Sequence, residues 1–215
     1  MYDIKKKKSV NAMMALLLFG GFLSLFNETI LNVALSNMMN ELKVSATTIQ
    51  WLSTGYVLVV AIMVPATAFL LHTYTTKKLY VGAMSFFLIG TIFASISHVF
   101  SILLLCRMIQ AIGTGLLVPI MVNTALCINP PEKHGFAMSL CTGAILIGPS
   151  LGPIVSGMVL QFFIWRALFV LLIPFVLICI VGGMFFWDTA MEITKNKIDL
   201  ISMLLSSIGN EYKKI

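Results

Sequence analysis

The sequence predicts an all-α integral membrane protein, built as a bundle of six transmembrane helices. Only 10% of the residues are charged and the mean hydropathy is +1.00, whereas soluble domains carry about 25% charged residues. The apolar runs are much longer than barrel strands of about ten residues, and they do not alternate. At about 20 residues per span plus short loops, 215 residues hold roughly six helices.

Six apolar runs are long enough to span a bilayer, and no domain linker separates them. In chain order they cover residues 10–36, 48–71, 79–97, 101–127, 136–162 and 167–187. The basic cluster Lys5–Lys8 also suits a secretory signal, but the first run is too long for a signal core and no small-residue cleavage site follows promptly. We therefore predict a basic N-terminus over residues 1–9, a six-helix domain over 10–187 and a final segment over 188–215.

The final segment starts with a polar stretch and continues into a shorter apolar run. That run begins at Ile198, ends at Gly209 and is followed by the polar ending Asn210–Ile215. About a dozen apolar residues cannot cross a hydrocarbon core of about 30 Å. We expect this segment to be cytoplasmic and to contain the truncated start of a seventh helix.

Lysine and arginine are distributed unequally between the two sets of loops. If the N-terminus is inside, nine fall in inside segments before the tail: Lys5–Lys8, Lys77, Lys78, Lys133, Lys195 and Lys197. The outside segments hold Lys43 and Arg166. Because positive residues accumulate on the cytoplasmic side, we expect a multi-pass protein of the cell membrane with both termini in the cytoplasm. Trp51, Trp165 and Trp187 fall near predicted helix ends, where interfacial aromatic residues belong.

Glu28 is one of two clearly ionisable residues deep inside the predicted spans. Such residues are costly unless they are paired or hydrated, so they are functional candidates. Glu28 belongs to a stripe with four-residue spacing, which lies on one helix face. The stripe comprises Ser24, Glu28, Asn32 and Ser36, with Asn27 and Thr29 beside it. It is either a structural polar seam between helices or the wall of a water-filled cavity.

Arg107 is the second such residue, and it begins a stripe with Gln110 and Thr114 in the fourth run. An arginine near a helix end can snorkel to the interface, but Arg107 lies six residues inside its run. The first helix runs outward and the fourth inward, so Glu28 and Arg107 both lie roughly 10–14 Å below the outer surface. They can therefore meet. A carboxylate that alternates between an arginine and a proton is a reasonable proton-coupling device.

Small residues and prolines dominate the fifth run. Gly148, Gly152 and Ser156 recur every four residues and permit close helix contact. Pro149 and Pro153 remove backbone donors and so bend or loosen the helix. We expect a tightly packed fifth helix whose packing motif comprises Gly143, Gly148, Pro149, Gly152, Pro153 and Gly157.

Several function classes are disfavoured. A nucleic-acid binder gathers positive charge on a folded polar face, whereas here the net charge of +6 lies between apolar runs. The four cysteines form no C-x-x-C pair and are best interpreted as packing residues. The sequence contains no H-E-x-x-H, no G-x-S-x-G and no paired intramembrane aspartates. We therefore expect neither an enzyme nor a cofactor or metal site.

These motifs in combination resemble the major facilitator superfamily, and most of all its fourteen-helix drug/proton antiporter branch, the EmrB/QacA-like proteins. The resemblance covers about residues 11–209. It is carried by Glu28 ahead of Asn32-Val33-Ala34-Leu35, by Arg107-Met-Ile-Gln110-Ala-Ile-Gly113, by the Gly143 to Gly157 "antiporter" motif, and by Trp165-Arg166 ahead of an apolar helix.

The resemblance implies the N-terminal half of a major facilitator fold, itself two three-helix repeats, with substrate bound between this half and a second one. It implies proton-coupled efflux of small amphipathic or cationic molecules, with Glu28 and Arg107 as the proton-coupling groups. It also implies a cavity lined by Ser24, Asn27, Asn32, Gln110 and Thr114. The expected partners are the lipid bilayer, protons, and a missing C-terminal half or a second copy.

Two features depart from the family pattern. The family's loop between the second and third helices carries Gly-x-x-x-Asp-Arg, but here His72 replaces the acidic residue and only the basic pair Lys77 and Lys78 remains in this cytoplasmic loop. The second departure is length, because family members have twelve or fourteen helices in two halves. We therefore expect a truncated transporter; the alternative is a non-transporting membrane remnant or an interaction partner of another membrane protein.

Overall fold

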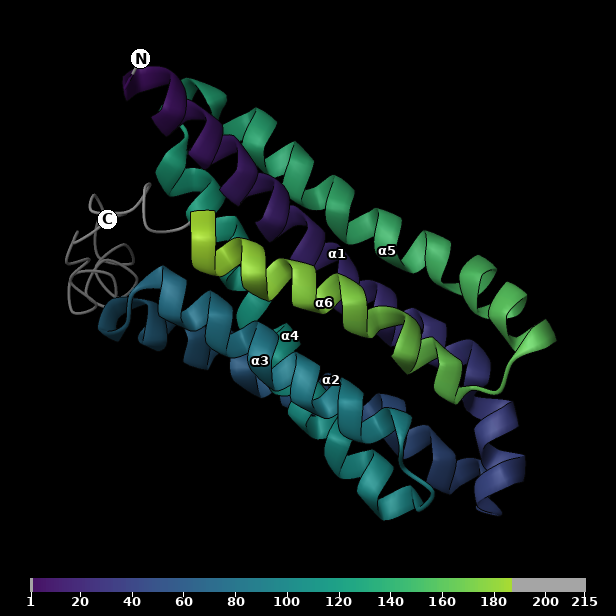
Figure 1. Ribbon diagram of the computed structural model, residues 1–215. Helices are drawn as coiled ribbons and strands as arrows, with labels where there is room; N and C mark the ends of the chain where they lie inside the picture. The colour runs from purple at the N-terminus through teal and green to yellow at the C-terminus, as the bar shows by residue number, and fades with distance from the viewer. Residues whose placement is uncertain (1, 187–215) are drawn as a thin grey trace, which may run out of the picture.

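The computed structural model describes residues 2–186, with side chains described for residues 11–185 (Figure 1). The helices are α1 (Tyr2–Leu42), α2 (Ala46–Thr73), α3 (Thr76–Ser95), α4 (Phe100–Ile128), α5 (His134–Phe162) and α6 (Arg166–Phe186). A short 3₁₀ turn, η1 (Pro131–Lys133), leads into α5, and no strand occurs between residues 2 and 186. The predicted start of a seventh helix lies outside the described residues.

All six α-helices contain a segment long and apolar enough to cross a membrane, the shortest being 20 residues. A helix of about this length matches the hydrocarbon core of a bilayer. The predicted all-α bundle of six membrane helices is therefore confirmed within the described part of the chain.

The first helix is longer than the apolar run that predicted it. α1 begins at Tyr2, includes the basic cluster and continues to Leu42, whereas the apolar run covered residues 10–36. Lysine, methionine and glutamate are good helix formers, so the helix extends beyond the segment that hydropathy alone marks. It ends where Lys43 adopts a left-handed conformation with φ of 52°, a frequent way for a helix to stop.

The connections between helices are short, and local chemistry explains several of them. Ser45 caps α2, because its hydroxyl oxygen accepts a hydrogen bond of 3.1 Å from the backbone N–H of Thr48. α4 stops at Ile128 because Pro130 and Pro131 follow closely, and a proline pushes the preceding residue out of the helical region. Such short connections hold successive helices antiparallel.

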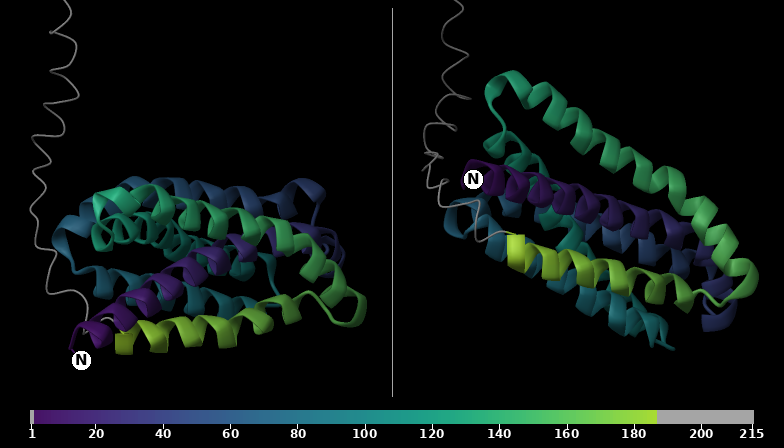
Figure 2. Two further views of the ribbon diagram at one scale, coloured as in Figure 1. Left: turned by 90° about the horizontal axis from the view of Figure 1, so that it is seen from above. Right: turned by 45° about the horizontal axis from the view of Figure 1, so that its top comes forward.

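α1 and α4 form the centre of the bundle. In their apolar stretches 56% of the residues are buried, against 17% in α2 and in the α5 stretch. α4 packs mainly on α2 and α3, and α1 packs mainly on α5, while the sequence neighbours α2 and α3 scarcely touch. Figures 1 and 2 show α5 lying along α1. Contact of α1 with α5 thus corresponds to contact of α4 with α2, as two three-helix repeats require.

The contact between α5 and α1 depends on residues without bulky side chains. A Cβ atom on Gly148 would lie 3.0 Å from the carbonyl oxygen of Phe22, and one on Gly152 would overlap the side chain of Thr29. The Ser156 hydroxyl donates a hydrogen bond of 2.8 Å to the carbonyl oxygen of Ile30. α5 remains one continuous helix through its two prolines.

The predicted packing motif is therefore only partly at this contact. Gly143 and Gly157 face open space, with no neighbouring atom within 4 Å of a Cβ built on either glycine. Pro149 and Pro153 are also exposed. The four-residue spacing of the buried members explains the difference, because residues 148, 152 and 156 share one helix face and the other members of the motif do not.

Candidate functional site

A buried arginine lies at the centre of the bundle. Arg107 on α4 is 0% exposed, so it does not snorkel to an interface. Its Nη1 donates a hydrogen bond of 2.9 Å to Oε1 of Gln110, one turn along the same helix. The Nε2 of Gln110 donates one of 2.8 Å to Oγ1 of Thr91 on α3. The three-residue spacing that placed Arg107 and Gln110 on one face thus brings them into direct contact.

The aromatic ring of Tyr56 on α2 lies against the same guanidinium group. The Cζ atom of Arg107 is 4.1 Å from the ring centroid, which is a cation–π contact. The Tyr56 hydroxyl is 2.5 Å from Oγ1 of Thr114 and donates a longer hydrogen bond, 3.5 Å, to the carbonyl oxygen of Ser24. A fully buried tyrosine therefore joins α1, α2 and α4 at this point.

The N-terminal part of the polar stripe on α1 belongs to this network. Ser24 and Asn27 are 0% exposed, and the Ser24 hydroxyl donates a hydrogen bond of 2.8 Å to the carbonyl oxygen of Gly21. Neither polar atom of the Asn27 side chain has a hydrogen-bond partner. Nε and Nη2 of Arg107 also lack partners. Four buried polar atoms are thus left unsatisfied, which is unusual in a folded interior.

Glu28 is half-buried and lies within electrostatic range of Arg107. No direct ion pair joins the two residues in the described part of the chain, because the guanidinium group is held by Gln110 and Tyr56 instead. The structure thus brings the two predicted residues to the same region from neighbouring helices. Each of the two charged groups acts electrostatically on the other.

The C-terminal part of the α1 stripe is on the surface. Asn32 and Ser36 are exposed, and Oδ1 of Asn32 accepts a hydrogen bond of 2.5 Å from the hydroxyl of Ser53 on α2. Ser24 is buried between helices, as expected of a polar seam, whereas Asn32 and Ser36 lie on the surface of the bundle.

A second polar cluster closes the end of the bundle where α1 stops. Arg166 forms an ion pair of 2.5 Å with Glu41, and its Nε and Nη2 donate hydrogen bonds of 3.1 and 2.9 Å to the carbonyl oxygen of Ser97. Nε1 of Trp165 donates one of 2.6 Å to the Glu41 carboxylate. Trp165 directly precedes α6, at a helix end as predicted, and is 2% exposed with Arg166 over its ring; Trp187 lies outside the described residues. Trp51 is 51% exposed.

The predicted basic loop between the second and third helices is mostly helical. His72 lies in the last turn of α2, where it is exposed. Lys77 and Lys78 lie in the first turn of α3. The connection itself is therefore shorter than the sequence suggested.

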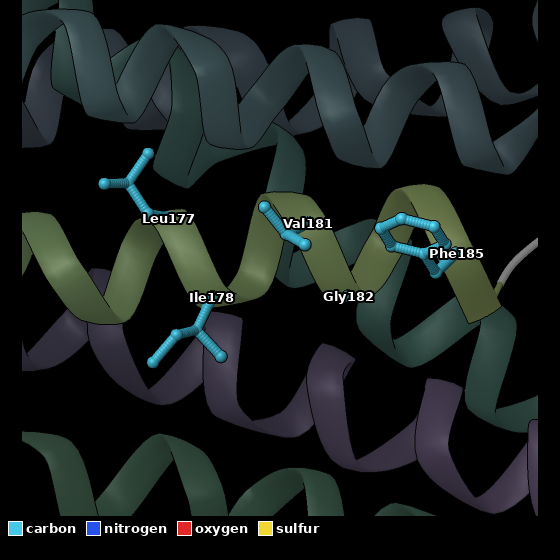
Figure 3. Close-up of a pocket in the computed structure, with 5 residues that line it drawn as sticks. All are labelled: Leu177, Ile178, Val181, Gly182 and Phe185. Atoms are coloured by element: carbon cyan, nitrogen blue, oxygen red, sulfur yellow. The ribbon is translucent and has the colours of Figure 1, made fainter.

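The apolar groove on α6 has no features of a substrate site. It has a volume of about 660 Å³ and is lined only by residues of α6: Leu177, Ile178, Val181, Gly182 and Phe185 (Figure 3). None of these side chains can hydrogen-bond to a ligand. Within residues 2–186 no cluster of three or more metal-ligating side chains occurs. The buried network on α1, α2, α3 and α4 is therefore the candidate functional site.

Sequence reasoning did not identify Tyr56 and Thr91. One signal for Tyr56 was available: a tyrosine in the middle of an apolar run needs a partner for its hydroxyl when it is buried. Thr91 offers no comparable signal, because threonine in a membrane helix can bond its own backbone. It does so here, donating a hydrogen bond of 2.6 Å to the carbonyl oxygen of Phe87.

The curated proteins to which the chain is similar include resistance proteins. It is 44% identical over 200 residues to the lincomycin resistance protein LmrB of Bacillus subtilis, with 93% of this chain and 42% of that protein covered. It is 32% identical over 193 residues to MdtD of Salmonella newport, whose name gives multidrug resistance as a provisional role; 89% of this chain and 40% of that protein are covered. The chain thus spans well under half the length of these relatives.

Solved structures show the same fold at low sequence identity. A crystal structure of the peptide transporter POT in complex with sulfate matches with a TM-score of 0.75 at 15% identity, covering 92% of this chain and 44% of that one. An inward-facing bacterial homologue of the lysosomal transporter Spinster matches with a TM-score of 0.67 at 17% identity, covering 94% and 49%. The sequence profile of the Major Facilitator Superfamily matches residues 17–199. The chain, a multi-pass membrane protein, therefore belongs to the Major Facilitator Superfamily.

Proposed function

We propose that this chain forms one six-helix half of a proton-coupled exporter of small amphipathic or cationic molecules. The observation that carries the proposal is the pair formed by half-buried Glu28 and fully buried Arg107 on adjoining helices. Ionisable groups inside a membrane protein are costly and mark ion or proton pathways. The names of relatives, which refer to lincomycin and to multidrug resistance, support an export function.

In the proposed cycle Glu28 exchanges a proton for the positive charge of Arg107. When Glu28 is protonated it has no charge to attract the guanidinium group. When it loses the proton, its carboxylate is drawn towards the unpartnered Nε and Nη2 atoms of Arg107. The amide of Asn27, also unpartnered, is a further hydrogen-bonding group for either state.

The proposed transport cycle requires a second half. Transporters of this type bind substrate between two halves that rock against each other, and the relatives are more than twice as long as the matched region. A C-terminal half or a second copy would supply the missing wall. The exposed polar residues of α1, Asn32 and Ser36, would then face the substrate pathway.

We place the protein in the cell membrane with its N-terminus in the cytoplasm, because lysine is concentrated in the loops on that side. The alternative function is a non-transporting partner of another membrane protein. It is favoured by the length of the chain relative to its relatives, and an efflux measurement distinguishes the two functions.

The test is proton-driven efflux from vesicles that hold this chain joined to a second six-helix half, with lincomycin and a cationic dye as substrates. Glu28→Gln mimics the protonated carboxyl group and should abolish the dependence of efflux on the proton gradient. The matched control is Glu132→Gln, the same change at the exposed turn η1, which should retain it. Wild-type coupling in the Glu28→Gln protein would exclude Glu28 as the proton-linked group.

A further inference from the structure

Arg107 is held at two points, and neither is Glu28. One is the amide oxygen of Gln110, 2.9 Å from Nη1. The other is the face of the Tyr56 ring, 4.1 Å from Cζ. A cation over an aromatic face is attracted by the ring quadrupole, and the attraction is strongest where water is excluded, as it is around two fully buried side chains.

The Tyr56 ring is itself fixed in place. Its hydroxyl contacts Oγ1 of Thr114 on α4 at 2.5 Å and the backbone of Ser24 on α1 at 3.5 Å. Next to it, Gly55 is buried on the face of α2 that meets α4. The ring therefore cannot follow the guanidinium group if that group moves. In this contact the Tyr56 ring is held by its hydroxyl group, and the Arg107 side chain is the group that can move away.

Tyr56 and the Glu28 carboxylate compete for one cation. Nε and Nη2 of Arg107 are buried without partners, and a carboxylate accepts two such donors side by side. The guanidinium group nevertheless stays on the ring and makes no ion pair with Glu28 among the described residues. The ring is one of the two groups that hold the guanidinium group in place, and unlike Gln110 it comes from a different helix.

We propose that Tyr56 is a positioning residue that keeps Arg107 on its ring and away from Glu28, and so sets the pH at which Glu28 takes up its proton. The proposal rests on the proposed proton-coupling role of Glu28, which it deepens. It gives α2 a role in proton coupling, although both charged residues lie on other helices.

Few other ionisable groups can influence the position of Arg107 between Tyr56 and Glu28. Glu28 from α1, Tyr56 from α2 and Arg107 from α4 are the ionisable side chains that act on one another there. The central turns of α3, α5 and α6 contain no acidic or basic residue. Buried thiols occur at Cys106, next to Arg107 on α4, at Cys141 on α5 and at Cys179 on α6, and thiols are ordinarily protonated at neutral pH. A shift in the protonation of Glu28 after a change at Tyr56 can therefore be assigned to Arg107.

The test is an infrared pH titration of the Glu28 carboxyl band in the 215-residue chain reconstituted in lipid, with the band assigned by its loss in Glu28→Gln. Tyr56→Leu removes the aromatic face, so Arg107 should move to Glu28 and lower the titration midpoint by about one pH unit or more. Tyr56→Phe keeps the face but removes the hydroxyl contacts with Thr114 and Ser24 that fix the ring, so it should move the midpoint less than Tyr56→Leu does. Tyr56→Met is the substitute if the leucine variant does not fold.

The matched control is Tyr80→Leu, which removes another fully buried tyrosine, one whose hydroxyl donates to the carbonyl oxygen of Leu16 on α1. It should not move the midpoint. A wild-type midpoint in folded Tyr56→Leu, or an equal shift in Tyr80→Leu, would overturn the positioning role. Because the titration needs no transport, its result is independent of the efflux test: loss of the proposed function would appear as unchanged coupling in Glu28→Gln instead.

Discussion

At the scale of single residues, the two arginines of the described chain show opposite solutions to carrying charge at a membrane protein. Arg166 lies at a helix end, pairs with a carboxylate and donates to a backbone carbonyl. Arg107 is enclosed, and has one amide oxygen, one aromatic face and two unpartnered nitrogen atoms. A buried cation that is incompletely satisfied is expensive, so its retention is best explained by a role in which its partner changes.

We expect Arg107→Lys to be a severe change. A lysine has no planar group that can stack on Tyr56 while it donates to Gln110. Proton-driven efflux by the completed transporter should fall by about ten-fold or more, which is the effect of losing about 1.4 kcal/mol of interaction. Arg166→Lys is the control for the loss of a stacked arginine outside the buried network, because it also removes a contact with an aromatic ring but can keep the ion pair with Glu41. Equal losses in both variants would contradict a special role for Arg107.

At the scale of elements, α5 is a helix with one face closely fitted to α1. The glycines at 148 and 152 let the backbones of α5 and α1 approach, and Ser156 adds a hydrogen bond between the two helices. Association of helices in lipid relies on such close packing, because burial of apolar surface gives no advantage there. At the far end of α1, Glu41, Trp165 and Arg166 connect α1 to the start of α6.

The packing of α5 can be tested with two matched glycine substitutions. Gly152→Leu should overlap Thr29 and separate α5 from α1, at a cost of about 1–3 kcal/mol or more. The amount of folded protein in the membrane, measured by size-exclusion chromatography after mild extraction, should fall. Gly157→Leu adds the same side chain where the space is open and should have little effect. Wild-type yield for the Gly152→Leu protein would show that the contact tolerates separation.

At the scale of the whole molecule, the six helices correspond to less than half of the solved transporter chains that share this fold. The superfamily profile and the solved structures match the bundle, while the matched relatives are more than twice as long as this region. The polar network lies inside the bundle, whereas Asn32 and Ser36 of the α1 stripe are exposed on the surface of the bundle. This arrangement suits a proton site within one half and a substrate site between two halves.

We expect the loops on the lysine-rich side to be cytoplasmic. Single cysteines placed at Lys78 and at Glu132, in a variant without the native cysteines, should react with a membrane-impermeant maleimide only after the cells are opened. A cysteine at Lys43 should react in intact cells, because it lies on the side with few positive residues. Reaction of Lys78→Cys from outside intact cells would reverse the proposed orientation.

We expect the 215-residue chain alone to give no efflux. One bundle cannot alternate the access of a site that two bundles must enclose. The measurement is dye efflux from vesicles that contain only this chain and carry a proton gradient, with the completed transporter as positive control. Efflux above that of empty vesicles would mean that copies of the chain supply both halves.

The six described membrane helices, and the presence of Glu28 and Arg107 inside two of them, were predictable from the sequence alone. Both follow from one physical rule: a lipid environment requires long apolar helices and makes every internal charge conspicuous. Spacing of four also predicted the face of α5 that meets α1, since Gly148, Gly152 and Ser156 are the buried members of their motif. The predicted packing motif also included Gly143 and Gly157, which are not at this contact and face open space.

The partners of Arg107 were decided only by the tertiary structure. Periodicity places side chains on a face of their own helix, but it does not say which helix lies opposite or how far away. Tyr56 contacts Arg107 and Thr91 contacts Gln110, because α2 and α3 both pack on α4. The sequence determined that a cation is buried in this bundle. The packing of the helices determined that an aromatic ring of α2 lies against this cation, and that no ion pair joins it to Glu28 in the described part of the chain.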